Sequence, residues 1–202
     1  MPLATHSVIR SPWDRIRTLL GDVAPGDDPI DMTIGEPKHP MPEFLMETMA
    51  EAAAGFGHYP PIRGTEALRK SISDWIKRRY GVAVDPETSI LALNGSREGL
   101  YSAVVPALER RADVANPVVL IPNPFYQCYA AAAVAAGTEP VFLPALREAN
   151  FLPDLDALEA DTALLERTVA FYVCSPANPQ GTLADTAYWR RALDLARKHD
   201  FM

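Results

Sequence analysis

The second half of the chain alternates between short apolar runs and longer stretches in which apolar residues recur at helical spacing. Runs rich in Val, Ile and Leu predict strands buried on both faces, at Ser89–Leu93, Val118–Ile121, Pro140–Leu143 and Val169–Val173. The periodicity of the remaining stretches predicts helices over Arg97–Glu109, Tyr126–Ala136, Leu155–Leu165 and Thr186–His199. Strands that alternate with helices favour an α/β fold with a mainly parallel sheet.

The first part of the chain lacks this alternation. Its pattern predicts, in order, a short helix ended by Gly21, a strand at residues 30–34, a proline-rich loop at Gly35–Pro42, and helices at about residues 43–54 and 65–80. Thr65 is placed to cap the last of these helices and Gly81 to end it. Thr182 and Asp185 have the spacing of a capping box ahead of the final helix of the chain. The change of pattern predicts that residues 1–45 form a separate layer or small domain.

Composition narrows the class of protein. The chain has 202 residues, 48% of them hydrophobic, and a formal net charge of −7. This length allows one or two domains with a real core, and an acidic chain lacks the basic stripe that nucleic-acid binding needs. The longest apolar run, Tyr129–Ala136, is too short to cross a bilayer, and the N-terminus has no apolar run of signal-peptide length. We therefore expect a cytoplasmic protein that binds neither nucleic acid nor membrane.

The cysteines and histidines argue against a disulfide-stabilised protein and against a metal site. Cys128 and Cys174 lie in apolar stretches and are expected to be small buried residues in a reducing compartment. The four histidines share no metal-ligand spacing, and the motifs HExxH, CxxC and GxSxG are absent from the sequence. No metal site and no disulfide framework are expected.

A turn of small and polar residues follows the predicted strand Ser89–Leu93 and opens a helix. Gly95, Ser96 and Arg97 combine close backbone approach, a hydroxyl, a guanidinium and the free N–H groups of a helix start, which favours an anion site. The turn matches neither a Walker loop nor a dinucleotide fingerprint. The same residues also suit an ordinary strand-to-helix turn capped by Asn94 or Ser96, and this alternative stays open.

Other candidate segments are weaker when each is taken alone. Pro122–Tyr129 follows a predicted strand at the edge where open α/β sheets bind ligands, and its aromatic residues suit either stacking on a flat ligand or core packing. Ser175–Gly181 holds two X-Pro bonds, either of which can be cis, in a loop that could aim the Asn178 amide into a site or form a simple turn. Tyr59–Gly64 and Ile34–Pro37 are typical of a surface tyrosine and a turn.

Taken in order, these five segments resemble the class I and II aminotransferases, the fold-type-I group of pyridoxal-phosphate enzymes. Ile34–Pro40, Asn94–Glu98 and Asn123–Gln127 are most similar to the succinyldiaminopimelate aminotransferase branch. The resemblance implies a three-layer αβα large domain with a mainly parallel sheet. Residues 46–202 would be the first, incomplete part of this cofactor-binding domain, and residues 1–45 an N-terminal arm and small-domain segment.

The resemblance also implies roles for single residues. Gly95, Ser96 and Arg97 match the segment that holds the phosphate of pyridoxal 5′-phosphate. The remaining matches are Tyr126 (or Phe125 in its place) for stacking on the cofactor ring, Asn178 for a hydrogen bond to its phenolic oxygen, Tyr59 for the phosphate of a partner subunit's cofactor, and Gly35 for the substrate carboxylate. The Tyr59 match implies a homodimer. Gln180 stands where family members usually have Thr or Ser.

The implied activity is transamination between an amino acid and a 2-oxo acid. The branch resemblance suggests N-succinyl-diaminopimelate and 2-oxoglutarate as the pair, in lysine biosynthesis. The alternatives are a pyridoxal-phosphate-dependent lyase or synthase of the same fold, a non-catalytic truncated remnant, and an unrelated α/β phosphate-binding protein. Amino-acceptor assays separate the first two of these four hypotheses.

The lysine that forms the Schiff base in this family stands in a Ser-x-x-Lys context at the end of a buried strand. None of the lysines in the chain has that context: Lys38, Lys70, Lys77 and Lys198. We therefore expect this lysine to lie beyond Met202. The chain would then be an N-terminal fragment that contains no catalytic residue. Ser89–Leu93 would then lack a neighbouring strand, Val169–Val173 would be a bare apolar edge, and the isolated chain would be unstable and inactive.

Overall fold

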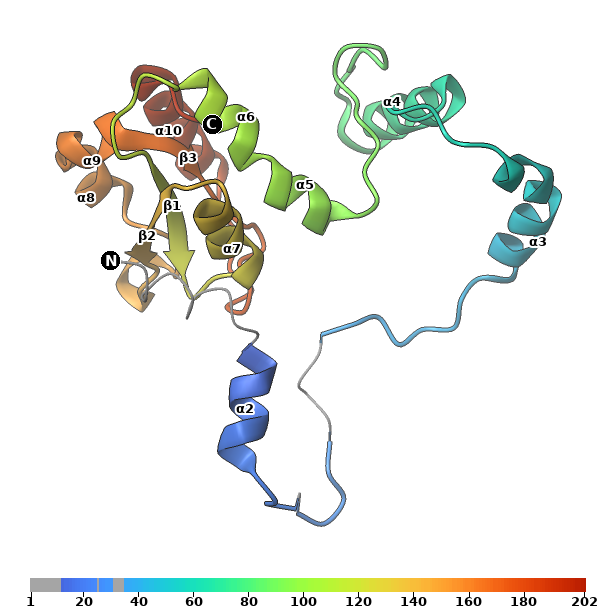
Figure 1. Ribbon diagram of the computed structural model, residues 1–202, viewed down its shortest axis with the longest axis horizontal. Coiled ribbons are helices and arrows are strands. Elements are labelled where there is room, and N and C mark those ends of the chain that lie inside the picture. The colour runs from blue at the N-terminus through green and yellow to red at the C-terminus, as the bar shows by residue number, and fades with distance from the viewer. Residues whose placement is uncertain (1–11, 25, 31–34) are drawn as a thin grey trace. The chain divides into compact units, whose positions relative to one another are not determined.

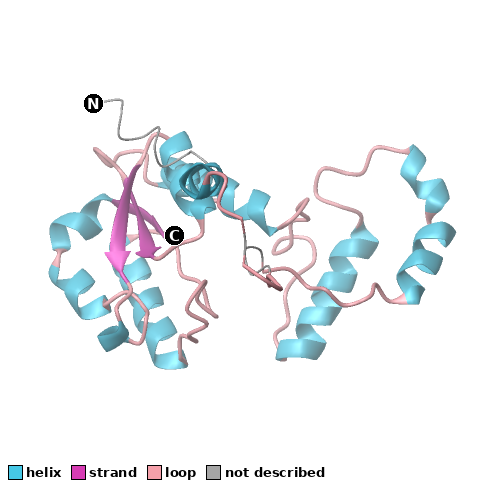
Figure 2. Cartoon of the chain, turned by 90° about the horizontal axis from the view of Figure 1, so that it is seen from below, coloured by secondary structure: helices cyan, strands magenta, loops and turns pink. Residues whose placement is uncertain are grey.

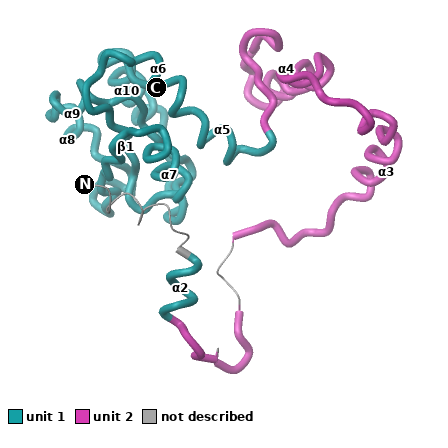
Figure 3. The backbone as a smooth tube through the Cα atoms, viewed as in Figure 1, with its two compact units in different colours: residues 1–19, 94–202 teal, residues 20–93 magenta. Residues whose placement is uncertain are grey.

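The computed structural model describes residues 12–24, 26–30 and 35–202 (Figure 1). The chain divides into two compact units, residues 1–19 with 94–202 and residues 20–93, which are described separately (Figure 3). The domain boundary expected between residues 45 and 46 stays a prediction. Most of the strand expected at residues 30–34 lies outside the described residues.

The unit formed by residues 1–19 and 94–202 contains a three-stranded parallel sheet with the order β2-β1-β3. The strands are β1 (Val118–Asn123), β2 (Glu139–Pro144) and β3 (Thr168–Phe171). β1 runs in register with β2 from Val118 opposite Glu139 to Asn123 opposite Pro144, and its pairing with β3 shifts between Val118 and Val119. The predicted parallel α/β sheet is confirmed, with three of its four predicted strands.

Helices cover both faces of this sheet, and the strands lie among them in Figure 2. The helices of this unit are α2 (Pro12–Leu20), α5 (Ser96–Ser102), α6 (Val104–Arg110), α7 (Gln127–Ala135), α8 (Leu155–Ala160), α9 (Thr162–Arg167) and α10 (Thr186–His199), with the short helix η2 (Arg147–Ala149). Val119 and Ile121 of β1 pack against α6 and α7, whereas Val118 and Leu120 pack against α8, α9 and α10. Alternate residues of one strand therefore enter two cores, and the predicted three-layer αβα arrangement is confirmed.

Two predicted helices are each split in the structure. The helix expected over Arg97–Glu109 is α5 followed by α6, because Pro106 has no N–H to donate to the carbonyl of Ser102 and its ring crowds that carbonyl. The helix expected over Leu155–Leu165 breaks at Asp161, whose carboxylate accepts a hydrogen bond from the Leu164 N–H (3.0 Å) and starts α9.

The final helix begins and ends where the sequence predicts, but its cap differs. The Asp185 side chain alone accepts a hydrogen bond from the Tyr188 N–H at 2.7 Å. The Thr182 carbonyl instead accepts from the Ala177 N–H (2.7 Å) in the preceding loop. The predicted capping box of Thr182 and Asp185 is therefore wrong, and a single aspartate N-cap takes its place.

The segment Ser89–Leu93 is not a strand, because a strand needs a paired neighbour and no ladder to this segment exists within the described residues. At the other predicted weak point, β3 is an edge of the sheet but is not bare. Met202 donates to the Val169 carbonyl (3.0 Å) and accepts from the Phe171 N–H (2.8 Å), which is the pattern of a parallel bridge.

The unit of residues 20–93 has little core of its own. It contains α3 (Glu43–Glu51), η1 (Ala53–Gly57) and α4 (Glu66–Tyr80). The Thr65 hydroxyl accepts a hydrogen bond from the Leu68 N–H and Gly81 ends α4 at a φ of 71°, so both predicted helix ends are confirmed. No residue of α3 or η1 is buried.

Among the described helices, none has both the length and the apolarity needed to span a bilayer.

Candidate functional site

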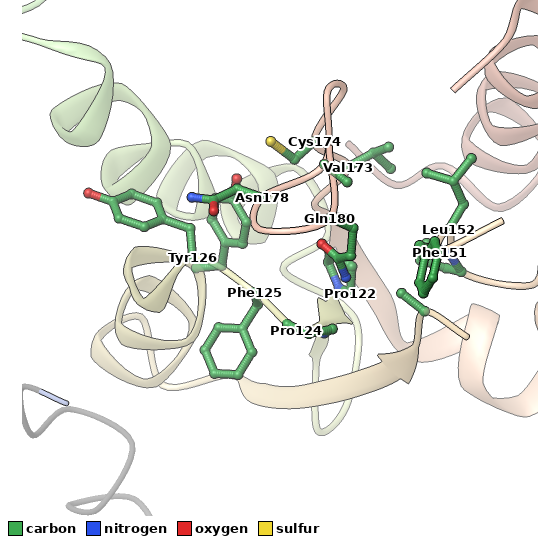
Figure 4. Close-up of a pocket in the computed structure, with 14 residues that line it drawn as sticks. Pro122, Pro124, Phe125, Tyr126, Phe151, Leu152, Val173, Cys174, Asn178 and Gln180 are labelled. Atoms are coloured by element: carbon green, nitrogen blue, oxygen red, sulfur yellow. The ribbon is translucent and has the colours of Figure 1, made fainter. Parts of the chain in front are cut away.

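The candidate site lies at the carboxyl edge of the sheet. β1 and β3 are parallel, so the segments that follow them emerge at the same edge. A hollow there is lined by Tyr126 from the segment after β1, and by Cys174, Asn178 and Gln180 from the loop after β3 (Figure 4). Three cis peptide bonds, Asn123–Pro124, Ser175–Pro176 and Asn178–Pro179, shape these two segments. The two segments therefore line one hollow.

The turn before α5 supplies polar groups beside this edge. Gly95 is the N-cap residue at φ 125°, a region that favours glycine, and the Glu98 carboxylate accepts from the Asn94 N–H at 2.7 Å. The N–H groups of Ser96 and Arg97 have no helical carbonyl to bond, since they belong to the first turn.

Arg97 and Tyr126, which are 29 residues apart, meet in the structure. Arg97 Nε donates a hydrogen bond to the Tyr126 hydroxyl at 2.6 Å, and the guanidinium carbon lies 5.6 Å from the centroid of the ring. The terminal nitrogens of Arg97 make no hydrogen bond to a described residue. Arg97 lines an open hollow together with Asn94, Glu98 and Gln127. A cation and an aromatic face are thus held side by side.

Behind Tyr126, a row of tyrosines leads into the core. The ring of Tyr126 meets that of Tyr129 edge-on at 5.7 Å, and Tyr129 stacks on Tyr172 with centroids 4.3 Å apart. Burial raises the pKa of Tyr129 above its ordinary value, and burial raises that of Tyr172 to about 12. The row fixes the back of the site. Tyr172 was not singled out from the sequence, although it stands at the end of a predicted strand.

Phe125 was the alternative stacking residue. Its ring packs against Phe142 of β2 at 4.9 Å, and Figure 4 shows it turned away from Tyr126 and Asn178. Tyr126 lies on the same side of the hollow as Asn178 in that view. The geometry therefore favours Tyr126 over Phe125 as the residue that faces a ligand.

A comparison with known families identifies the family of the chain. The model of a family described as aminotransferase class I and II matches residues 27–202. The chain belongs to the class I and II aminotransferases. The family resemblance predicted from the ordered segments is confirmed.

Individual aminotransferases match the chain along most of its length. LL-diaminopimelate aminotransferase of Dehalococcoides mccartyi is 33% identical over 179 residues, which cover 88% of this chain and 44% of that protein. The enzyme of the same name from Syntrophobacter fumaroxidans is 36% identical over 191 residues, 93% of this chain and 46% of that protein. The chain spans about half the length of these relatives.

Solved aminotransferase structures share the fold. An aminotransferase from Neisseria meningitidis superposes with a TM-score of 0.87 and 31% identity, covering 100% of this chain and 51% of that one. BacF from Bacillus subtilis, in a substrate-bound structure, gives a TM-score of 0.80 at 29% identity, covering 100% and 50%. Class I and II aminotransferases depend on pyridoxal phosphate, and this aminotransferase chain shares their fold.

The residues at the sheet edge fit that cofactor. A phosphate requires a cation and hydrogen-bond donors, which the free terminal nitrogens of Arg97, the Ser96 hydroxyl and the first N–H groups of α5 offer. A pyridine ring requires a flat face, which Tyr126 offers, and a phenolic oxygen requires a donor, which the exposed amide of Asn178 offers. The side-chain oxygen of Gln180, at the position of the departure from the family, is buried and has no hydrogen-bond partner among the described residues.

Other residues of the aminotransferase pattern lie outside this edge. Gly35 and Tyr59 belong to the unit of residues 20–93, where both are exposed, so their roles stay predictions. None of the described lysines lines the hollow, and Lys70 and Lys198 instead pair with Asp74 (2.7 Å) and Glu159 (3.7 Å). Within the described residues, no group of three His, Cys, Asp or Glu is placed to hold a metal ion.

Proposed function

We propose that the protein containing this chain is a pyridoxal-phosphate-dependent aminotransferase that moves an amino group between an amino acid and a 2-oxo acid. One observation carries the proposal. Ser96, Arg97, Tyr126 and Asn178 come from three separate segments and gather at the carboxyl edge of one parallel sheet. Together they offer the groups that the phosphate, the pyridine ring and the phenolic oxygen of the cofactor require.

The proposed roles follow from the chemistry of each side chain. Ser96 and Arg97 bind the phosphate, with the backbone N–H groups that follow Gly95. Tyr126 lies against one face of the pyridine ring, and the Asn178 amide donates to the phenolic oxygen. The bound cofactor supplies an electron sink that stabilises the carbanion left when the α-proton of the substrate is removed. The work of this chain is to hold and orient the cofactor.

The substrate is proposed as a diaminopimelate-type amino donor with 2-oxoglutarate as acceptor. The sequence pattern resembles the succinyldiaminopimelate branch, whereas the relatives found by comparison are named LL-diaminopimelate aminotransferases. The two donors share the carbon skeleton and differ in whether the distal amino group is acylated. Gly35 is the proposed neighbour of the substrate carboxylate.

A homodimer in the cytoplasm completes the proposal. Large apolar side chains are exposed on α3 and η1, among them Phe44 (62%), Met46 (56%) and Phe56 (70%). Apolar surface of this extent on consecutive helices supports a partner that covers it. The proposed partner is a second copy, to whose cofactor phosphate Tyr59 would reach. Analytical ultracentrifugation of the full-length protein tests the stoichiometry.

The direct test starts from the full-length protein freed of cofactor. Titration with pyridoxal phosphate is expected to change the absorbance of the cofactor, and LL-diaminopimelate or N-succinyl-LL-diaminopimelate with 2-oxoglutarate is expected to yield glutamate. Cofactor binding with elimination or condensation products but no glutamate would favour the lyase or synthase alternative. A phosphate-ester ligand that binds while pyridoxal phosphate causes no spectral change would favour the unrelated phosphate-binding protein.

A further inference from the structure

Arg69 of α4 is the one charged side chain that is buried among the described residues, with 8% of its surface exposed. Its guanidinium donates three hydrogen bonds, from Nη1 to the Gly64 carbonyl (2.6 Å), from Nη2 to Glu87 Oε1 (2.7 Å) and from Nε to the Pro86 carbonyl (3.1 Å). A buried cation is costly unless it is bonded on every side, so these partners and Arg69 fix one another.

The network holds a tight turn in place. The Gly64 N–H donates to the Pro61 carbonyl at 2.8 Å, which closes the turn. Arg69 donates a hydrogen bond to the carbonyl of the same glycine. Gly64 has a φ of 78°, and a Cβ built on it would lie 2.9 Å from Ala92 Cβ. The turn is therefore wedged between the Arg69 guanidinium and the backbone segment that carries Ala92.

The turn and the residues directly before it present large side chains outward. Tyr59 and Ile62 are 101% and 97% exposed, although Pro60 and Pro61 between them restrict the backbone. A mobile surface loop needs no buried arginine to hold it. A fixed turn with exposed large side chains is suited to contact with another molecule at a defined position.

We infer that Arg69 is a positioning residue for Tyr59. Its guanidinium holds the turn Pro61–Gly64 so that the Tyr59 hydroxyl is presented to the cofactor phosphate of a second copy of the chain. This inference rests on the proposed function, which gives Tyr59 that target. Glu87 shares the task, because its carboxylate pairs with Arg69 (2.7 Å) and lies 3.9 Å from Arg63 of the turn.

The test compares two cofactors in the full-length protein freed of cofactor. Pyridoxal phosphate and pyridoxal differ by the phosphate that Tyr59 is proposed to contact. Arg69→Lys keeps the charge but loses the fork of three hydrogen bonds, and it is expected to raise the Kd of pyridoxal phosphate roughly tenfold, the factor that corresponds to one hydrogen bond to a charged group. The Kd of pyridoxal is expected to stay unchanged. Arg78→Lys, on an exposed arginine of the same helix, is the matched control.

A double-mutant cycle with Tyr59→Phe separates positioning from general stability. If Arg69 acts through the Tyr59 hydroxyl, Arg69→Lys adds no further loss of pyridoxal phosphate affinity in the Tyr59→Phe background. Glu87→Gln gives a second, milder perturbation if Arg69→Lys does not fold, and it is expected to show the same selectivity with a smaller factor. A loss that persists in the Tyr59→Phe background, or that is equal for pyridoxal, overturns the inference.

The outcomes for the inference and for the proposed function are distinct. If Tyr59→Phe lowers the affinity for pyridoxal phosphate but Arg69→Lys and Glu87→Gln do not, the inference fails and the role of Tyr59 stands. If Tyr59→Phe leaves the affinity unchanged, both fail. If no variant or wild-type protein binds pyridoxal phosphate, the proposed function fails with them.

Discussion

The two units of the chain are held together by different kinds of interaction. In the unit with the sheet, alternate residues of β1 enter two apolar cores, and the candidate site lies where the strands end. In the unit of residues 20–93, α3 has no buried residue, and a hydrogen-bonded arginine, Arg69, holds the turn that follows Tyr59. The comparison indicates that the first unit is held by apolar packing, whereas the turn in the second unit is held by a polar network around Arg69.

The largest expected difference between the units is in the cost of removing an apolar side chain. Leu120→Ala leaves a cavity beside α8 and α10 and is expected to lower the free energy of unfolding by about 2 to 5 kcal/mol. Met46→Ala on the exposed face of α3 is expected to change it by less than about 0.5 kcal/mol at a protein concentration where no dimer forms. Denaturant unfolding measures both, and equal costs would break the comparison.

The next prediction concerns the separate contributions of the Arg97 charge and the Tyr126 hydroxyl to cofactor affinity. Arg97→Met is expected to raise the Kd of pyridoxal phosphate by roughly ten- to a hundredfold, because it removes a charge-assisted contact to the phosphate. Tyr126→Phe keeps the ring and loses only the hydroxyl that accepts from Arg97 Nε, so a few-fold rise is expected.

The alternative to direct phosphate binding is that Arg97 acts by orienting Tyr126. The double variant of Arg97→Met and Tyr126→Phe distinguishes the two roles. Additive losses that are absent with pyridoxal support direct contact between Arg97 and the phosphate. If Arg97→Met has no effect in the Tyr126→Phe background, the hydrogen bond between the two side chains is the function of the arginine.

The sequence predicted the sheet of the first unit well, because a strand buried on both faces is continuously apolar and its pattern needs no knowledge of its partner. The prediction of a strand at Ser89–Leu93 was wrong, because an apolar run does not indicate whether a neighbouring strand is present to pair with it. The helix breaks near Pro106 and at Asp161 were missed, although a proline without an N–H and an aspartate able to cap are local signals.

The site was predictable in its segments but not in its contacts. The ordered motifs located Ser96, Arg97, Tyr126 and Asn178 on turns that follow strands or start helices. The bond between Arg97 and Tyr126, and the packing of Tyr129 on Tyr172, join residues far apart in sequence, and only the fold brings them together. The Arg69 network was missed because nothing in an amphipathic helical pattern marks one arginine as buried.

A smaller effect is expected at the helix caps, where the units can be compared directly. Asp185 caps α10 and Thr65 caps α4, and replacing either by alanine is expected to cost about 1 kcal/mol. α10 packs into the sheet core through Ala192 and Leu195, so the loss caused by Asp185→Ala is expected to spread over its unit. Thr65→Ala is expected to loosen α4 alone. Amide hydrogen exchange measures both, and a uniform response in the two units would contradict the comparison.

The last prediction is a loss of stability of the sheet unit at alkaline pH. Burial raises the pKa of Tyr172 from 10.0 to about 12, so the folded state keeps a proton that the unfolded state loses. Above pH 10 the unfolded state therefore binds fewer protons than the folded state, and stability falls as the pH rises from 10 to about 12. Tyr172→Phe is expected to remove part of this fall while it keeps the stacked ring beside Tyr129. Unfolding curves at a series of alkaline pH values test this, and an unchanged slope in Tyr172→Phe would show that Tyr172 contributes nothing to the alkaline loss of stability.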